Sequence, residues 1–131
     1  LGVQVYSATE MPMDPYYLLA ILNSKLMSYL FRLRFQAKHL AGGYLSINKG
    51  QLERLPIRKI DFTDWSEKSQ HDRIVKLAKQ MSTLGQHSRQ AKQNSLVSIF
   101  NELDQQTDAI VYKLYRLTTS EIHDVEEAMR Y

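Results

Sequence analysis

Apolar residues recur at heptad spacing through the second half of the chain, and this repeat constrains the fold more than any other feature. From His71 onward, steps of three, four, three and seven residues connect Ile74, Leu77, Met81, Leu84 and Ala91. Steps of four and three residues then connect Leu96, Phe100, Leu103, Thr107, Ile110 and Leu114. This spacing places one apolar stripe on each of two helices. The short break near Gln93-Asn94-Ser95 predicts that they fold back as an antiparallel hairpin of coiled-coil type.

A long helix is also predicted near the start of the chain. Asp14 followed by Pro15 is typical of a helix N-terminus, because the carboxylate can accept from unpaired backbone N–H groups and proline has no N–H to lose. Apolar and aromatic residues then follow at helical spacing: Leu18, Leu19, Leu22, Leu26, Tyr29, Leu30 and Leu33. We therefore predict one helix from about Pro15 to Phe35.

The same stretch contains Asp14-Pro15-Tyr16-Tyr17, one residue away from the Asp-Pro-Pro-Tyr box with which adenine methyltransferases hold a flipped base. The second proline is missing, and no glycine-rich cofactor loop precedes the tetrapeptide in this chain. We therefore interpret it as a helix start. A complete methyltransferase is the alternative, and binding of S-adenosylmethionine by this chain would support it.

Short elements are predicted elsewhere. Val3 to Tyr6 alternates like the last strand of a sheet whose other strands would lie upstream, outside this chain. Tyr44 to Ile47 could form a strand after Gly42-Gly43, and Leu55 to Ile60 could form an edge strand around Pro56. Capping-box spacing occurs at Asn48 with Gln51, and again at Thr118 with Glu121, where a last short helix begins. The predicted fold class is α+β and mostly helical: a long helix packed on a few short strands, followed by an antiparallel helical hairpin and a short C-terminal helix.

Charge is unevenly distributed between the two halves. Residues 1–60 hold eight Lys and Arg against three Asp and Glu, whereas residues 61–131 hold nine against eleven. Arginine and lysine suit phosphates and guanine edges, asparagine suits adenine edges, and tyrosine offers a face on which bases stack. The candidate DNA-binding residues are Arg32, Arg34, Lys38, His39, Tyr44, Asn48, Lys49 and Arg54, with a solvated basic face as the alternative.

No catalytic or metal-ligating set of residues is apparent. The four histidines have no pair at ligand spacing, the chain has no cysteine, and it contains no nucleophile elbow, phosphate-binding loop or nuclease triplet. The longest apolar run, Tyr16 to Leu33, is interrupted by Lys25 and Arg32, which argues against a membrane span. We expect a cytoplasmic chain that is not an enzyme by itself. It begins at Leu1 without a signal peptide, so we also expect it to belong to a longer protein.

Four ordered segments of the chain resemble a known family: YLLAILNSKLMSYLFR, LSINKGQLERLPIRKI, HDRIVKLAKQM and DAIVYKLYRLTTSEIHDVEE. Together they are similar to the end of the TaqI-like C-terminal specificity domain, the target recognition domain of type IIG restriction-modification enzymes and adenine-specific DNA methyltransferases. They are also similar to the specificity subunits of type I restriction systems. In this family the helix with Leu22-Asn23-Ser24 packs on the sheet of the recognition domain, and Leu55-Pro56-Ile57 leads out of it.

The resemblance implies that residues 1–62 are the C-terminal part of a DNA target recognition domain and that residues 63–131 are a helical spacer. It implies double-stranded DNA as a partner, with methyl transfer, S-adenosylmethionine and any cleavage assigned to an upstream domain. No cofactor is expected in this fragment. A full recognition domain needs a larger sheet than residues 1–60 can build. A helical interaction module that forms a homodimer through its hairpin and makes no DNA contact is the alternative.

Overall fold

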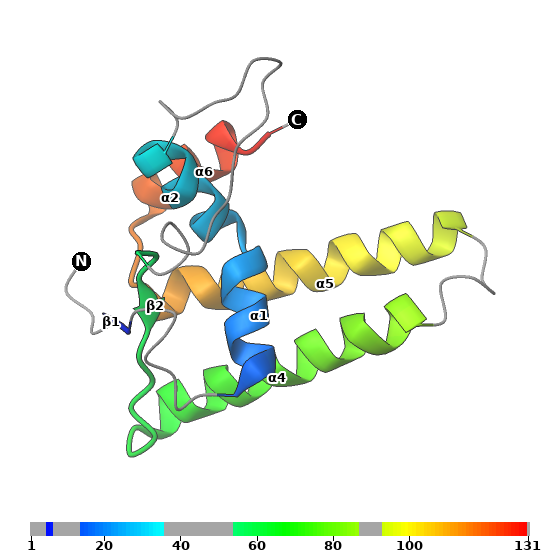
Figure 1. The fold of residues 1–131 in the computed structure, drawn as a ribbon, viewed down its shortest axis with the longest axis horizontal. Helices are drawn as coiled ribbons and strands as arrows, with labels where there is room; N and C mark the ends of the chain where they lie inside the picture. The colour runs from blue at the N-terminus through cyan, green and yellow to red at the C-terminus, as the bar shows by residue number, and fades with distance from the viewer. Residues whose placement is uncertain (1–4, 7–13, 36–53, 87–92, 131) are drawn as a thin grey trace.

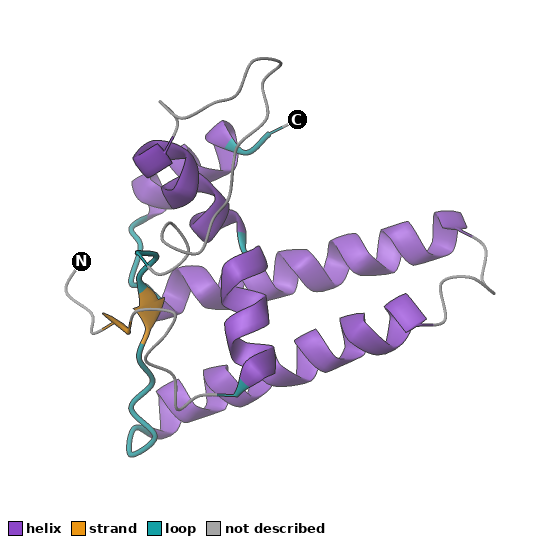
Figure 2. Ribbon diagram, in the orientation of Figure 1, coloured by secondary structure: helices purple, strands orange, loops and turns teal. Residues whose placement is uncertain are grey.

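The structure is a computed structural model, and it describes residues 5–6, 14–35, 54–86 and 93–130. Five helices and two very short strands make up the described part of the chain (Figures 1 and 2). The elements are β1 (Val5–Tyr6), α1 (Pro15–Asn23), α2 (Lys25–Phe35), β2 (Ile57–Arg58), α4 (Trp65–Gln86), α5 (Gln93–Leu114) and α6 (Thr119–Ala128). The prediction of a mostly helical chain is confirmed.

The single helix predicted from Pro15 to Phe35 is wrong, because Ser24 divides it into α1 and α2. Ser24 has an extended backbone (φ −68°, ψ 155°). Its hydroxyl donates a hydrogen bond to the Ile21 carbonyl at 2.7 Å and accepts one from the Met27 N–H at 3.2 Å. It therefore ends α1 and caps α2. As a result α1 crosses α4, whereas α2 lies against α5 and α6 (Figure 1).

Asp14 is the N-cap of α1, so the interpretation of Asp14-Pro15-Tyr16-Tyr17 as a helix start is confirmed. The Asp14 carboxylate accepts a hydrogen bond from the Tyr16 N–H at 2.8 Å, and Pro15 occupies the first helical position. Tyr17 points into the protein and is fully buried. The two tyrosines of this stretch thus form the first turn of a packed helix.

Removing this cap should destabilise the protein without changing its fold. Asp14→Ala is expected to lower the free energy of unfolding by about 1 kcal/mol, because the Tyr16 N–H loses its acceptor. Urea unfolding followed by circular dichroism measures this difference. Asp14→Asn is the matched control, since asparagine caps about as well as aspartate. Equal losses in both variants would contradict the capping role.

The helices α4 and α5 run antiparallel and side by side, as the heptads predicted (Figure 1). Ile74, Leu77 and Leu114 are buried along the seam. Two boundaries differ from the prediction. The helix α4 begins at Trp65, before the predicted start at His71, and the Asp64 carboxylate accepts from the Ser66 N–H there at 2.9 Å. Residues 93–95, where the break between the helices was predicted, belong to α5.

The strands form one antiparallel pair in which Val5 lies opposite Arg58 and Tyr6 opposite Ile57. Within the described residues β1 therefore pairs with a strand downstream in the chain. Further strands upstream, outside this chain, stay a prediction. The predicted strand at Tyr44 to Ile47 and the capping box at Asn48 lie outside the described residues. Within the described residues α1 packs mainly on α4, and its contact with the two-stranded sheet is smaller, with Tyr17 bonding to the Arg58 carbonyl of β2. This corrects the prediction of a helix packed mainly on strands.

One hydrophobic core connects both halves of the chain. It includes Tyr17, Met27, Ile57, Val111 and Val125, all buried. The helix α6 contributes to this core through the buried side chain of Val125. The division at residues 62 and 63 stays a prediction, and the described parts of both segments share the core.

The capping box predicted at the start of α6 is confirmed. The Thr118 N–H donates to the Glu121 carboxylate at 2.8 Å, and the Glu121 N–H donates to the Thr118 hydroxyl at 3.1 Å. The two bonds fix the point at which the chain turns from α5 into α6. Val125 is buried on the inner face of the helix.

Candidate nucleic-acid interface

The last turn of α2 contains two arginines, and their side chains contact different neighbours. Arg32 is half-buried and donates a hydrogen bond to the Ala128 carbonyl at the end of α6, at 3.3 Å. Arg34 is exposed, and its guanidinium donates to the Arg54 carbonyl. Arg54 is exposed as well. The structure therefore brings Arg34 and Arg54 together and places Arg32 toward α6. We call Arg34 and Arg54 the arginine pair.

The arginine pair lies at both ends of the segment that holds the other candidates. Lys38, His39, Tyr44, Asn48 and Lys49 fall within residues 36–53, outside the described residues. In the sequence, Arg34 lies two positions before this segment, and Arg54 follows it directly. The two arginines that flank this segment in the sequence therefore lie close to each other.

The charge of the arginine pair has no partner of opposite sign within the described residues. The ion pairs there involve Lys25, Arg58, Lys68, His71 and Arg130 as the basic members. Basic residues in the last turn of a helix also interact favourably with the helix dipole, which is a structural reason for Arg32 and Arg34 to occur here. The dipole accounts for their position on α2, but it does not supply a counterion for Arg54.

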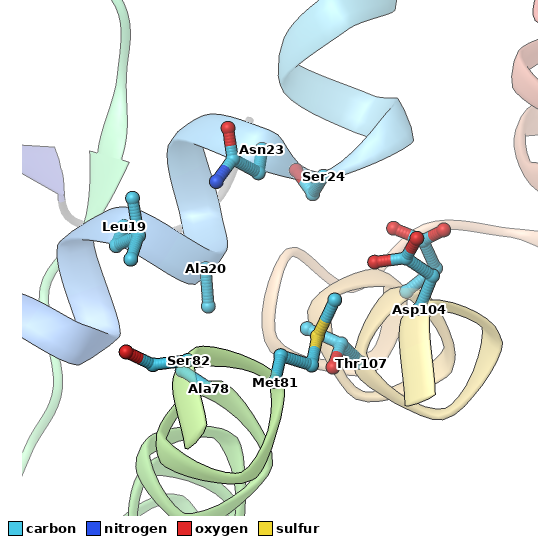
Figure 3. A pocket seen from close by; sticks show the side chains of 10 residues that line it. Leu19, Ala20, Asn23, Ser24, Ala78, Met81, Ser82, Asp104 and Thr107 are labelled. Atoms are coloured by element: carbon cyan, nitrogen blue, oxygen red, sulfur yellow. The ribbon is translucent and has the colours of Figure 1, made fainter. Parts of the chain in front are cut away.

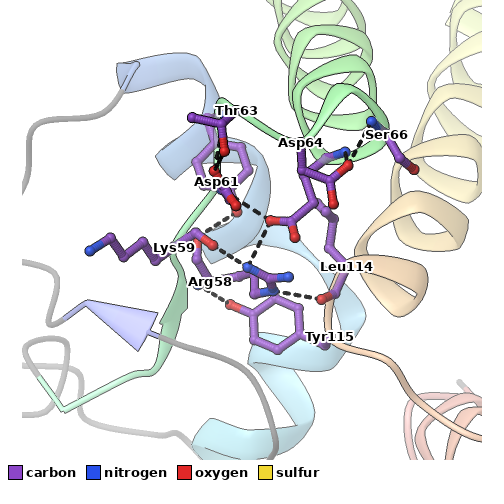
Figure 4. A network of polar contacts seen from close by, with 10 residues as sticks. Arg58, Lys59, Asp61, Thr63, Asp64, Ser66, Leu114 and Tyr115 are labelled. Carbon is purple, nitrogen blue, oxygen red and sulfur yellow. Dashed lines mark hydrogen bonds and ion pairs between the residues drawn. The ribbon is translucent and has the colours of Figure 1, made fainter.

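Arg58 is one of the eight basic residues of the first half, yet it does not contribute to a basic surface. It is only 5% exposed, and its side chain lies in the network of polar contacts drawn in Figure 4. Its Nε donates to the Leu114 carbonyl at 2.7 Å, and its Nη1 lies 3.1 Å from Glu67 Oε1. A second bond goes to the Lys59 carbonyl. The side chain therefore ties β2 to the ends of α4 and α5.

Two buried tyrosines complete this network around β2. The Tyr115 hydroxyl accepts from the Arg58 N–H at 2.8 Å and donates to the Pro56 carbonyl at 2.6 Å. The Tyr17 hydroxyl donates to the Arg58 carbonyl at 2.7 Å. Burial raises the pKa of both hydroxyls well above the usual range, so they remain protonated donors. We name Arg58, Glu67, Tyr17 and Tyr115 the β2 anchor.

A cavity of about 230 Å³ lies between α1, α4 and α5 (Figure 3). Asp108 lines it and is only 6% exposed, and its carboxylate accepts a hydrogen bond from the Lys25 N–H at 3.0 Å. Burial raises the pKa of Asp108 to about 6, against the opposing effect of the Lys25 N–H and the Lys25 charge. Burial likewise raises the pKa of Asp104, one helical turn away on α5.

The raised pKa of Asp108 predicts a pH-dependent cost of keeping this carboxylate ionised. In the folded state Asp108 binds a proton as the pH falls below about 6, whereas in the unfolded state it does so only near its ordinary pKa of 3.8. Protonation of Asp108 therefore favours the folded state, and its contribution to the free energy of unfolding rises as the pH falls from about 6 toward 4. Asp108→Asn removes the titration. The variant should gain stability relative to the wild type at neutral pH and lose that gain by about pH 4.

Urea unfolding of both proteins across this pH range measures the difference. Asn retains a side-chain oxygen that can accept from the Lys25 N–H, so the fold should persist. A difference that stays constant with pH would show that Asp108 titrates normally.

No family model matches this chain, and neither a curated protein nor a solved structure matches it. The resemblance to target recognition domains therefore depends on the four sequence segments alone. Among the described helices, none combines the length and the hydropathy that a transmembrane span requires.

Proposed function

We propose that this chain is a DNA sequence-recognition fragment of a restriction-modification adenine DNA methyltransferase, and that it is not catalytic by itself. The observation that carries the proposal is the arginine pair: two exposed guanidinium groups, without a carboxylate partner in the described residues, at both ends of the segment 36–53. The guanidinium group matches the geometry of a phosphate and stays charged at every physiological pH.

In this proposal each part of the chain has a distinct role. The arginine pair contacts phosphates of double-stranded DNA and orients the fragment on the duplex. The polar residues of the segment 36–53, namely Lys38, His39, Tyr44, Asn48 and Lys49, supply further phosphate and base contacts. The α4–α5 hairpin acts as the spacer. An upstream methyltransferase domain of a cytoplasmic parent protein binds S-adenosylmethionine and transfers the methyl group.

The direct test is binding of a fluorescently labelled duplex to the full chain, measured by anisotropy at low salt. Non-specific protein–DNA complexes typically have dissociation constants of about 10⁻⁴ to 10⁻⁶ M, and we expect an affinity in this range or tighter. An unlabelled duplex should compete for the site. Absence of binding at low salt would contradict the proposal.

A second candidate function is a helical interaction module that forms a homodimer and makes no DNA contact. Two exposed apolar side chains on α5 favour it, since Val97 is 57% and Ile99 42% exposed. Buried apolar surface drives association between helices. Light scattering decides: a dimer without affinity for DNA supports this function, and a monomer counts against it.

A further inference from the structure

The cavity between α1, α4 and α5 combines apolar walls with a charged end (Figure 3). Leu19 and Ala20 from α1 and Ala78 and Met81 from α4 line one part of it. The carboxylates come from α5, where Asp104 and Asp108 are one helical turn apart. In Figure 3 the Asp104 carboxylate lies across the open space from Leu19 and Ala20.

Among the described residues that line the cavity, none is basic. The charge of the Lys25 ammonium group on α2 acts on both carboxylates, but that group forms its ion pair with Glu126 of α6, at 2.9 Å. Only the backbone N–H of Lys25 bonds to Asp108. Asp108 therefore caps the start of α2 with one oxygen, while the charge of the acidic pair is compensated only in part.

We propose that this cavity binds a small alkylammonium compound, with the ammonium group at Asp104 and Asp108 and the aliphatic chain against Leu19, Ala20, Ala78 and Met81. Charge complementarity favours a cation at the acidic end, and the buried Asp108 carboxylate gains more from a cation than the exposed Asp104 carboxylate does. The aliphatic chain would be removed from water by the apolar walls.

The size of the cavity limits the length of this ligand. Sites for drug-sized molecules usually enclose about 300 to 1,000 Å³, and this cavity encloses about 230 Å³. A short unbranched chain with one terminal ammonium group fits that space better than a ring system. Neither member of the arginine pair lines the cavity, so the test below does not require that the chain bind DNA.

The experiment titrates the full chain with n-hexylammonium chloride, 1-hexanol and sodium hexanoate, and follows backbone amide shifts by NMR. We expect shifts at Ala20 and Ala78, and an affinity for hexylammonium about ten-fold higher than for hexanol, because a hydrogen bond to a charged group is strong. Hexanoate should not bind. Equal affinities for hexylammonium and hexanol would overturn the proposal, as would the absence of hexylammonium binding.

Three variants show whether the carboxylates are responsible. Asp108→Asn and Asp104→Asn should each weaken hexylammonium binding by several-fold and leave hexanol binding unchanged. Glu102→Gln removes an exposed acid from the same helix outside the cavity and should have no effect. If all three variants weaken binding equally, the interaction is a general attraction to α5 and the proposal fails.

A pH series gives a readout that does not depend on any variant. Asp108 faces Asp104 on its own helix, Lys25 on α2 and Glu126 on α6, and the hexylammonium ion stays charged throughout this range. Because burial raises the pKa of Asp108 to about 6, hexylammonium binding should strengthen as the pH rises through that value, while hexanol binding stays constant. A hexylammonium affinity that does not change with pH would contradict the role of Asp108.

Discussion

Replacing Arg58 with alanine is expected to lower the free energy of unfolding by about 3 kcal/mol, the largest effect on stability that we predict for a single side chain. The substitution leaves the Leu114 carbonyl without its donor and Glu67 without its cation, both at the junction of β2 with α4 and α5. Removing one member of a buried ion pair is costly because the other charge stays desolvated. Urea unfolding at neutral pH measures the loss.

Two controls separate the β2 anchor from a general effect of charge. Arg73 on α4 is exposed, so Arg73→Ala should change stability by no more than about 0.5 kcal/mol. The double variant Arg58→Met with Glu67→Leu replaces both charges by apolar groups and should recover much of the loss. If Arg58→Ala unfolds no more easily than Arg73→Ala, the β2 anchor does not hold β2 in place.

Replacing both members of the arginine pair with glutamine is expected to weaken duplex binding by about ten-fold to a hundred-fold at low salt, because two charged contacts to phosphates are lost. Arg34 and Arg54 are exposed, so the loss of the Arg34 hydrogen bond and of its interaction with the helix dipole should lower the free energy of unfolding by no more than about 1 kcal/mol. The matched control is Arg73→Gln with Lys113→Gln, which removes two exposed charges from α4 and α5. It should retain nearly all of the affinity, and equal losses in both double variants would contradict a localised interface.

Local sequence signals predicted much of this fold. The caps at Asp14 and Thr118 follow from side chains within three residues of the groups they satisfy, and the heptads place the seam of α4 and α5 without any tertiary information. The break at Ser24 was missed because the apolar spacing continues across it. The bend is held by the hydroxyl of Ser24 and by Asp108, which accepts from the Lys25 N–H at the start of α2 although the two residues are 83 positions apart.

The candidate site was harder to predict from the sequence, because it also depends on contacts between residues that are far apart in the chain. A count of charges includes Arg58 in the basic half, but this side chain is buried and bonds to the Leu114 carbonyl, which is 56 positions away in the chain. The proximity of Arg34 and Arg54 could not be derived from a spacing of 20 residues. The i, i+4 spacing of Asp104 and Asp108 is visible in the sequence, whereas the apolar walls that face them come from α1 and α4.

The salt dependence of duplex binding tests the central claim most directly. Each phosphate contact that releases a counterion contributes a slope of about −0.9 to a plot of log Kobs against log salt concentration. If Arg34 and Arg54 each contact a phosphate, the double glutamine variant should show a slope shallower than the wild type by about 1.8, and the control variant should show the wild-type slope. An unchanged slope in the Arg34 and Arg54 variant would contradict the proposed interface.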